Sequence, residues 1–162
     1  MSERRLIVPV SPELLSDTLR VAERALDGTR YLAGALDALR STVVSPSADA
    51  RAFASLLGAH VDGVIVFGFF GGASGAGRLQ LVVVERDARR AGVGAAMVRE
   101  ALAAVRRDGA RFVLAELPDD PHELPGARAF LESCGFAEES RVEDFYRDGL
   151  ALSFMRMELA GA

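Results

Sequence analysis

An apolar run that leads through a short charged turn into a glycine-containing helix start constrains the fold more than any other feature of this chain. The run from Leu79 to Val84 is rich in β-branched and apolar residues, which is typical of a strand buried on both faces. From Ala95 to Val105, apolar residues recur at helical spacing without Gly or Pro, which predicts a helix. The sequence therefore predicts a strand and a helix joined by a loop of the form Arg89-x-x-Gly92-x-Gly94.

The two glycines of this loop lie where the first N–H groups of the helix have no partner within the helix. Gly92 and Gly94 lack a Cβ atom that would shield those donors, so an anionic group could reach them and the positive helix end. The pattern therefore predicts a diphosphate site. A Gly-x-x-x-x-Gly-Lys loop is excluded because the chain has no lysine, and a dinucleotide fingerprint needs a third glycine where Met97 stands.

Turn and capping residues divide the rest of the chain into further elements. Ser11 and Pro12 are typical of an N-cap and a first helical position, so a helix is expected to begin there. The expected helices cover residues 13–40 with a break at Asp27-Gly28, Ala95–Val105, and Gly126–Cys134. The expected strands are Arg5–Val10, Phe53–His60, Val64–Phe70, Leu79–Val84, Arg111–Leu117, and a pair in the tail Phe145–Leu159 that flanks a turn at Asp148-Gly149. Residues 61–63 are expected to form a hairpin turn, and the glycine-rich stretch 71–77 a loop.

Length and composition favour one soluble domain over residues 1–162. The chain has 162 residues, of which 50% are hydrophobic, and no segment reaches the ~18 apolar residues of a membrane span. The N-terminus lacks the apolar region and cleavage site of a secretion signal, and the single Cys134 excludes an internal disulfide. We therefore expect a cytoplasmic protein.

Charge and ligand spacing weigh against several kinds of partner. The net charge of −4 and the absence of a basic run argue against a nucleic-acid partner, and no membrane partner is expected. His60 and His122 have no second His or Cys at ligand spacing, so no metal site is expected. A homodimer stays open as an alternative.

The loop and its place in the chain resemble the acyl-CoA loop of the GNAT family of N-acetyltransferases. In that family the pattern Gln/Arg-x-x-Gly-x-Gly/Ala follows an apolar strand, as Arg89, Gly92 and Gly94 do in this chain. The order of strands and helices is also similar over nearly the whole chain, including a helix that ends in a Gly-Phe turn and a closing hairpin. The resemblance implies an α/β (α+β) fold with a mixed, mostly antiparallel sheet of six to seven strands. That sheet would be splayed between its fourth and fifth strands and flanked by helices.

The resemblance also implies an activity and a binding mode. An amine would attack the thioester of acetyl-CoA directly, through a tetrahedral intermediate and without a covalent enzyme species. The backbone of the fourth strand, here Val82, Val83 and Val84, would pair with pantetheine, and an N–H group near Val82 would stabilise the oxyanion. The loop amides would bind the diphosphate; they belong to Arg89, Arg90, Ala91, Gly92, Val93, Gly94 and Ala95.

Two proton transfers need side chains. Neutralising an amine of pKa about 10.4 at pH 7 costs roughly 4.6 kcal/mol, part of which a carboxylate acting through water could supply. Glu116, near the end of the fifth strand, is the first candidate, and its alternative role is that of a surface or salt-bridged carboxylate. The tyrosine that the family uses to protonate the thiolate is replaced by Leu131 in this chain. Tyr146, in an Asp-Phe-Tyr-x-x-Gly tail, is the candidate replacement, and packing under the hairpin is its alternative role.

We therefore expect an acyl-CoA-dependent N-acyltransferase with acetyl-CoA as co-substrate and a small-molecule or peptide amine as acceptor. The absence of the family's tyrosine at Leu131 leaves a second hypothesis open, that of a non-catalytic acyl-CoA-binding regulatory module with the same fold.

Overall fold

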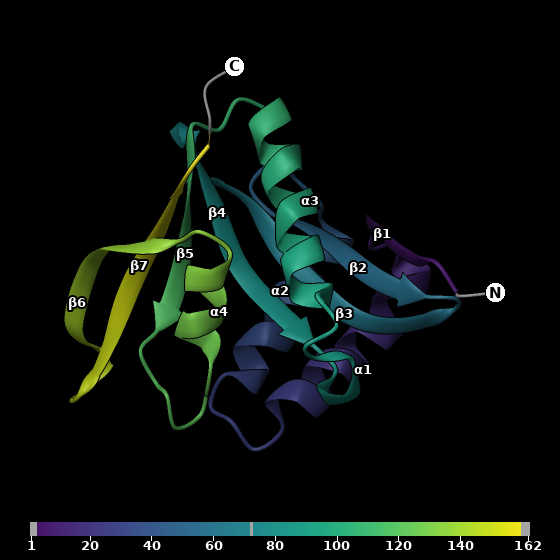
Figure 1. The fold of residues 1–162 in the computed structure, drawn as a ribbon, viewed down its shortest axis with the longest axis horizontal. Coiled ribbons are helices and arrows are strands. Elements are labelled where there is room, and N and C mark those ends of the chain that lie inside the picture. Colours follow the sequence, from purple (N-terminus) through teal and green to yellow (C-terminus); the bar gives the residue numbers. More distant parts are fainter. Residues whose placement is uncertain (1–2, 72, 160–162) are drawn as a thin grey trace.

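A seven-stranded mixed sheet forms the centre of the computed structural model, which describes residues 3–71 and 73–159 (Figure 1). The strands are β1 (Arg5–Pro9), β2 (Arg51–Leu57), β3 (His60–Phe70), β4 (Ala73–Val84), β5 (Phe112–Pro118), β6 (Ala137–Arg147) and β7 (Leu150–Glu158). Their order in the sheet is β1-β2-β3-β4-β5-β7-β6, and each neighbouring pair is antiparallel except β4 with β5. The helices are α1 (Leu15–Leu26), α2 (Leu32–Val44), α3 (Val93–Arg107) and α4 (Ala127–Ser133), with 3-10 turns η1 (Pro12–Leu14) and η2 (Arg86–Ala88).

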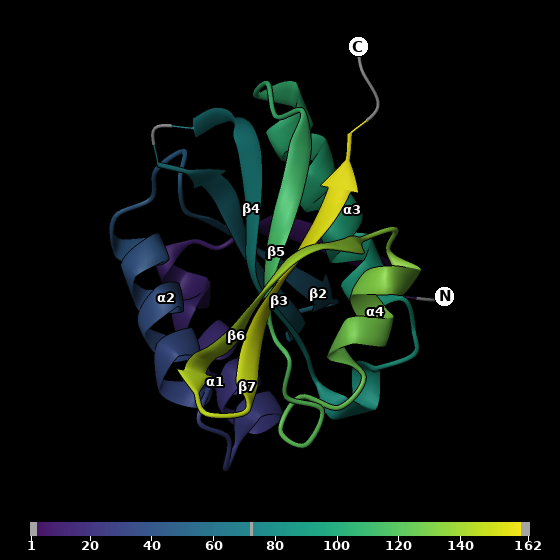
Figure 2. The ribbon, with the colours of Figure 1, turned by 90° about the vertical axis from the view of Figure 1, so that its left-hand side faces the viewer.

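Helices cover both faces of the sheet (Figures 1 and 2). Successive residues of the buried strand β3 alternate between two hydrophobic clusters, as the period of a strand requires. Val64 belongs to the cluster that contains Val21 of α1, whereas Ile65 belongs to the cluster that contains Met97 of α3. All four side chains are fully buried. Two separate cores therefore hold the sheet between α1 and α2 on one face and α3 and α4 on the other.

The expected fold class and the strand–loop–helix segment are confirmed, but three details of the sequence interpretation are wrong. The first strand of the tail pair begins at Ala137 and not near Phe145. The hairpin between β2 and β3 turns at Gly58 and Ala59, where Gly58 has φ +60°, and not at residues 61–63, which lie inside β3. The stretch 71–77 is not all loop, because β4 begins at Ala73. A Cβ atom on Gly77 would lie 2.8 Å from Cγ2 of Val113. The glycine there allows two strands to approach closely, which composition alone cannot distinguish from a turn.

The pairing between β4 and β5 ends part of the way along both strands. It runs from Ala76 opposite Phe112 to Leu79 opposite Ala115 and goes no further. At that point β4 contains a bulge, because the pairing with β3 skips Gln80. Beyond it β4 stays paired with β3 and β5 with β7, so the two strands diverge (Figure 1). The splay between the fourth and fifth strands, which the family resemblance implied, is therefore present.

A first prediction separates two glycines that lie in different surroundings. At Gly68 in β3, a Cβ atom would lie 2.4 Å from the backbone carbonyl of Asp49, so Gly68→Ala should lower the free energy of unfolding by about 2 kcal/mol or more. At Gly34 in α2 a Cβ atom meets nothing within 4 Å, so Gly34→Ala should raise it by about 0.5–1 kcal/mol through helix propensity. Urea unfolding measures both changes, and equal effects would contradict the close contact at Gly68.

Candidate active site

The loop between β4 and α3 presents backbone donors on the protein surface. Arg90 and Gly92 both have left-handed backbone conformations, with φ of 65° and 76°. The first hydrogen bond of the helix runs from the N–H of Ala96 to the carbonyl of Gly92 at 3.0 Å. The N–H groups of residues 93–95 therefore have no acceptor within the helix, and of these three residues Ala95 is the exposed one. Because Gly92 is exposed and nothing lies within 4 Å of its Cβ position, an anion can approach this helix end.

The remaining predicted loop residues contribute in different ways. Gly94 is buried, and a Cβ atom there would lie 2.9 Å from Cε2 of Phe130, so this glycine lets α4 pack closely on the start of α3. Arg89 folds back, and its Nε donates a hydrogen bond to the carbonyl of Val84 at 3.1 Å. Val82, Val83 and Val84 direct their side chains into the two cores. Only their backbone groups can therefore serve a ligand at the divergence.

An ion pair bridges β4 and β5 where their pairing stops. Nε of Arg78 lies 3.0 Å from Oε1 of Glu116, and Nη2 lies 3.1 Å from Oε2, which makes the contact bidentate. The guanidinium lies 5.4 Å from the centre of the Phe70 ring. The neighbours of Glu116 in β5, Ala115 and Leu117, point into the core under α3, so Glu116 lies on the opposite face. The salt-bridged state that was the alternative role for Glu116 is the one observed, and it is located at the divergence.

A wide bulge in β6 carries Tyr146. The pairing of β6 with β7 jumps from Val142 opposite Leu152 to Arg147 opposite Leu150, so residues 143–146 leave the ladder. Asp144, with φ of 53°, closes the bulge by accepting a hydrogen bond on Oδ1 from the N–H of Gly149 at 2.7 Å. Bulges re-aim side chains, and this one removes Tyr146 from the regular alternation of the strand.

The surroundings of Tyr146 are aromatic, and they leave its hydroxyl within reach of the charge of Glu116. Its ring centre lies 6.4 Å from that of Tyr31, in an edge-to-face arrangement, and 4.9 Å from that of Phe145. Partial burial raises the pKa of the Tyr146 hydroxyl above its ordinary value, and the negative charge of Glu116 raises it further. A phenol of raised pKa keeps its proton at neutral and mildly alkaline pH. The Tyr146 hydroxyl is therefore protonated at neutral pH and feels the charge of Glu116.

The loop after α1 is fastened to the loop after β5 by polar contacts that the sequence did not reveal. Tyr31 donates a hydrogen bond from its hydroxyl to Oδ2 of Asp120 at 2.9 Å, and Nε of Arg30 lies 3.0 Å from Oε2 of Glu123. Burial raises the pKa of the Tyr31 hydroxyl well above its ordinary value, and Asp120 adds to the shift. Burial acts to raise the pKa of Asp120 too, but the hydrogen bond from Tyr31 and the one from the Glu123 N–H bring it below its usual range. Asp120 therefore stays ionised and links the loop after α1 to the loop after β5.

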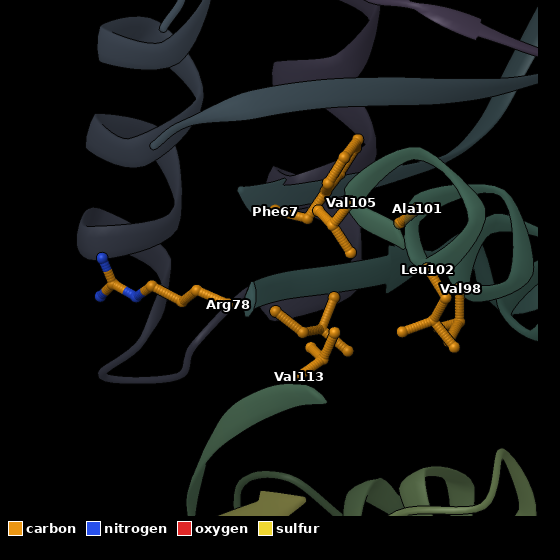
Figure 3. Close-up of a pocket in the computed structure, with 8 residues that line it drawn as sticks. Phe67, Arg78, Val98, Ala101, Leu102, Val105 and Val113 are labelled. Carbon is orange, nitrogen blue, oxygen red and sulfur yellow. The ribbon is translucent and has the colours of Figure 1, made fainter. Parts of the chain in front are cut away.

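Two cavities among the described residues differ in size and lining. A cavity of about 300 Å³ lies between the end of β5 and α4, and its lining includes Leu117, Asp120, Leu124, Gly126 and Arg128. A gap of about 10 Å³ lies under α3, with apolar side chains around it and the guanidinium of Arg78 pointing away (Figure 3). Only the first is large enough for part of an organic ligand.

Within residues 3–71 and 73–159, no His, Cys, Asp and Glu side chains group so that they could hold a metal ion, and no helix is long and apolar enough to cross a membrane.

Comparison with known proteins assigns the family. The profile of the acetyltransferase (GNAT) domain matches residues 49–138, which are more than half of the chain and include β4, the loop, α3, β5 and α4. The chain therefore belongs to the GNAT family of acetyltransferases. The comparison with curated proteins found no significant match.

Solved structures show the same fold at low sequence identity. A protein assigned to the GNAT acetyltransferases from Desulfovibrio desulfuricans is 22% identical, with a TM-score of 0.87 over 97% of this chain and 100% of that one. The ribosomal-protein-S18-alanine N-acetyltransferase of Escherichia coli is 15% identical, with a TM-score of 0.76 over 98% and 96%. An aminoglycoside 6'-acetyltransferase of type Ii is 17% identical, with a TM-score of 0.80 over 97% and 99%. These similarities establish the fold.

The exposed helix end generates a second prediction. Gly92→Glu should place a carboxylate where the diphosphate is expected and weaken acetyl-CoA binding by about 2 kcal/mol, roughly thirtyfold in Kd. Gly109→Glu is the matched control, because Gly109 also has a positive φ, has nothing within 4 Å of its Cβ position, and lies just beyond the other end of α3. Calorimetry should find the parent affinity in the control. An unchanged affinity in folded Gly92→Glu would rule out this diphosphate site.

Proposed function

We propose that the protein is an acyl-CoA-dependent N-acyltransferase that moves an acetyl group from acetyl-CoA to a primary amine. The observation that supports this most is the divergence of β4 and β5, with free backbone donors at the start of α3 and with the Arg78–Glu116 pair at the point where the pairing stops. Acetyl-CoA is the co-substrate, and no metal takes part in the proposed reaction.

The residues present fit such a co-substrate. The amides of residues 90–95 would bind the diphosphate, since those at the helix start have no intrahelical partner and the approach over Gly92 is open. The N–H of Arg89, which the sequence also placed in this set, donates instead to the carbonyl of Arg86 at 3.2 Å. The edge of β4 from Val82 to Val84 would hydrogen-bond the pantetheine arm, because β5 does not pair with it there.

The chemistry requires a proton acceptor, an oxyanion partner and a proton donor. Glu116 would take a proton from the acceptor's ammonium, directly or through water, and release it to solvent. The neutral amine would then form the C–N bond, and a backbone N–H near Val82 would stabilise the oxyanion of the tetrahedral intermediate. As the C–S bond breaks, Tyr146 would give its proton to the thiolate and regain one from the nitrogen. The sum is balanced: acetyl-CoA and an ammonium give an acetamide, free thiol and one proton.

A third prediction separates this proposal from a non-catalytic acyl-CoA-binding module. Incubation with acetyl-CoA and a panel of primary amines should release thiol well above the rate without amine. Glu116→Gln should slow that release most at acidic pH, where the amine is almost entirely protonated, and leave acetyl-CoA affinity nearly unchanged. Tight binding of acetyl-CoA with no amine-dependent release would favour the regulatory module. A pH–rate profile identical to that of the parent would return Glu116 to a structural role.

A fourth prediction isolates the hydroxyl of Tyr146. Tyr146→Phe should lower turnover by about tenfold to a few hundredfold, as expected for the loss of a general acid. Stability should barely change, because in the described part of the chain this hydroxyl has no hydrogen-bond partner. Tyr31→Phe is the control: it removes the bond to Asp120 and should reduce stability by about 1 kcal/mol, with a smaller effect on thiol release. Parent-like turnover in Tyr146→Phe would leave water as the donor.

A further inference from the structure

The Arg78–Glu116 pair has hydrogen-bonding capacity that the protein itself leaves unused. Nε and Nη2 of Arg78 are occupied by the two carboxylate oxygens of Glu116. Among residues 3–71 and 73–159, Nη1 of Arg78 has no hydrogen-bond partner, and each carboxylate oxygen accepts one bond although it has room for another. A cation with free donors and an anion with free acceptor sites thus lie side by side.

The position of the pair points to a ligand more than to stability. The two side chains are 31% and 27% exposed, and ion pairs of such exposure typically contribute about 0–1 kcal/mol to folding. The pair lies at the last paired residues of β4 and β5, on the face opposite α3 and α4. The co-substrate is expected to enter from the side of α3, so this face is the acceptor side. The Phe70 ring beside the guanidinium fixes the orientation of Arg78.

Three carboxylates of the loop after β5 are each held by an arginine. Glu123 and Asp120 lie 3.0 and 3.7 Å from Nε of Arg30, and Asp119 pairs with Arg141. A polycationic acceptor would need several carboxylates free to bind its ammonium groups. The loop after β5 offers none among these three. The recognition chemistry at the divergence is therefore that of one positive and one negative charge held close together.

We infer that the acceptor is a small zwitterion, an amino acid or a close analogue in which a carboxylate lies a short spacer away from the primary amine. Arg78 binds the carboxylate through its free donors, and Glu116 binds the ammonium and takes its proton. This inference rests on the proposed function and names the substrate class of the same site. The bond changes are those of the proposed reaction, and the carboxylate is bound but unchanged.

The experiment compares matched acceptors that differ only at the carboxylate. Thiol release is measured with each of the common amino acids, with the corresponding amino-acid amide, and with the amine that lacks the carboxyl group. At least one amino acid should be acetylated with a kcat/KM about tenfold to a hundredfold above that of its amide and amine, because a charge-assisted bidentate contact is lost in both. The preference should appear mainly in KM.

Variants of Arg78 tie the preference to this side chain. Arg78→Gln should reduce the ratio of kcat/KM between amino acid and amide to near unity. Arg78→Lys should keep part of this ratio, because lysine retains the positive charge but lacks the planar guanidinium that binds a carboxylate with two hydrogen bonds. Arg51→Gln is the matched control. Arg51, in β2, has its guanidinium 5.2 Å from the centre of the Phe67 ring, and its Nη1 lies 2.7 Å from Oδ2 of Asp108. The control should keep the full preference. Thermal melts of each variant identify any that fail to fold, in which case the Lys variant decides.

The outcomes distinguish this inference from the proposed function. Acetylation of amides or plain amines as fast as the amino acids, or of no amino acid at all, overturns the zwitterion acceptor and leaves the acetyltransferase activity standing. Loss of the preference in Arg51→Gln to the same extent as in Arg78→Gln also overturns it. Failure to bind acetyl-CoA, tested by calorimetry without any acceptor, would instead overturn the proposed function.

Discussion

The parallel contact between β4 and β5 is the constraint on which the candidate site depends. Parallel strands need a crossover, and α3 provides it, so the start of α3 must lie at the carboxyl end of β4. The pairing lasts only from Ala76 to Leu79, and the bulge at Gln80 marks where β4 turns away. One short ladder thus produces both a helix end open to an anion and a strand edge without a partner. Each strand remains anchored by its other neighbour, so the opening does not leave either one loose.

A second set of contacts positions the hairpin of β6 and β7 over the opening. Nη2 of Arg128, in the first turn of α4, donates to Oγ of Ser153 at 2.9 Å and to Oε1 of Glu138 at 3.2 Å. These bonds join α4 to both strands of the hairpin, and the Arg141–Asp119 pair joins β6 to the loop after β5. Ser153 is fully buried, so the hydrogen bonds to its hydroxyl are shielded from water. The bulge that carries Tyr146 is therefore built on a fixed base, although β6 itself is exposed along its length.

The sequence predicted what local patterns control and missed what depends on contacts across the chain. The strand from Leu79 and the helix from Ala95 were predictable because their periodicity is local, and Gly92 because a missing Cβ exposes the donors of a helix start. The positive φ of Gly92 is seen only in the structure. The glycine-rich start of β4 was misread, since its glycines serve close packing of strands. The partners of Glu116 and Tyr31, Arg78 and Asp120, lie 38 and 89 residues away, so no spacing rule connects them. The backbone part of the site was thus predictable, whereas the pairing of its side chains was not.

The departure from the family at Leu131 has a structural counterpart. Leu131 is 7% exposed and belongs to the core cluster under α3 and α4, next to Phe130, which packs on Gly94. A proton donor at this position would have to reach the divergence from a side chain that now fills the core. Tyr146 approaches from the opposite face, where burial and the charge of Glu116 keep its hydroxyl protonated. Moving the donor from α4 to the hairpin would also place it beside the acceptor. The same bulge of β6 would then both line the acceptor side and supply the proton for the departing thiol.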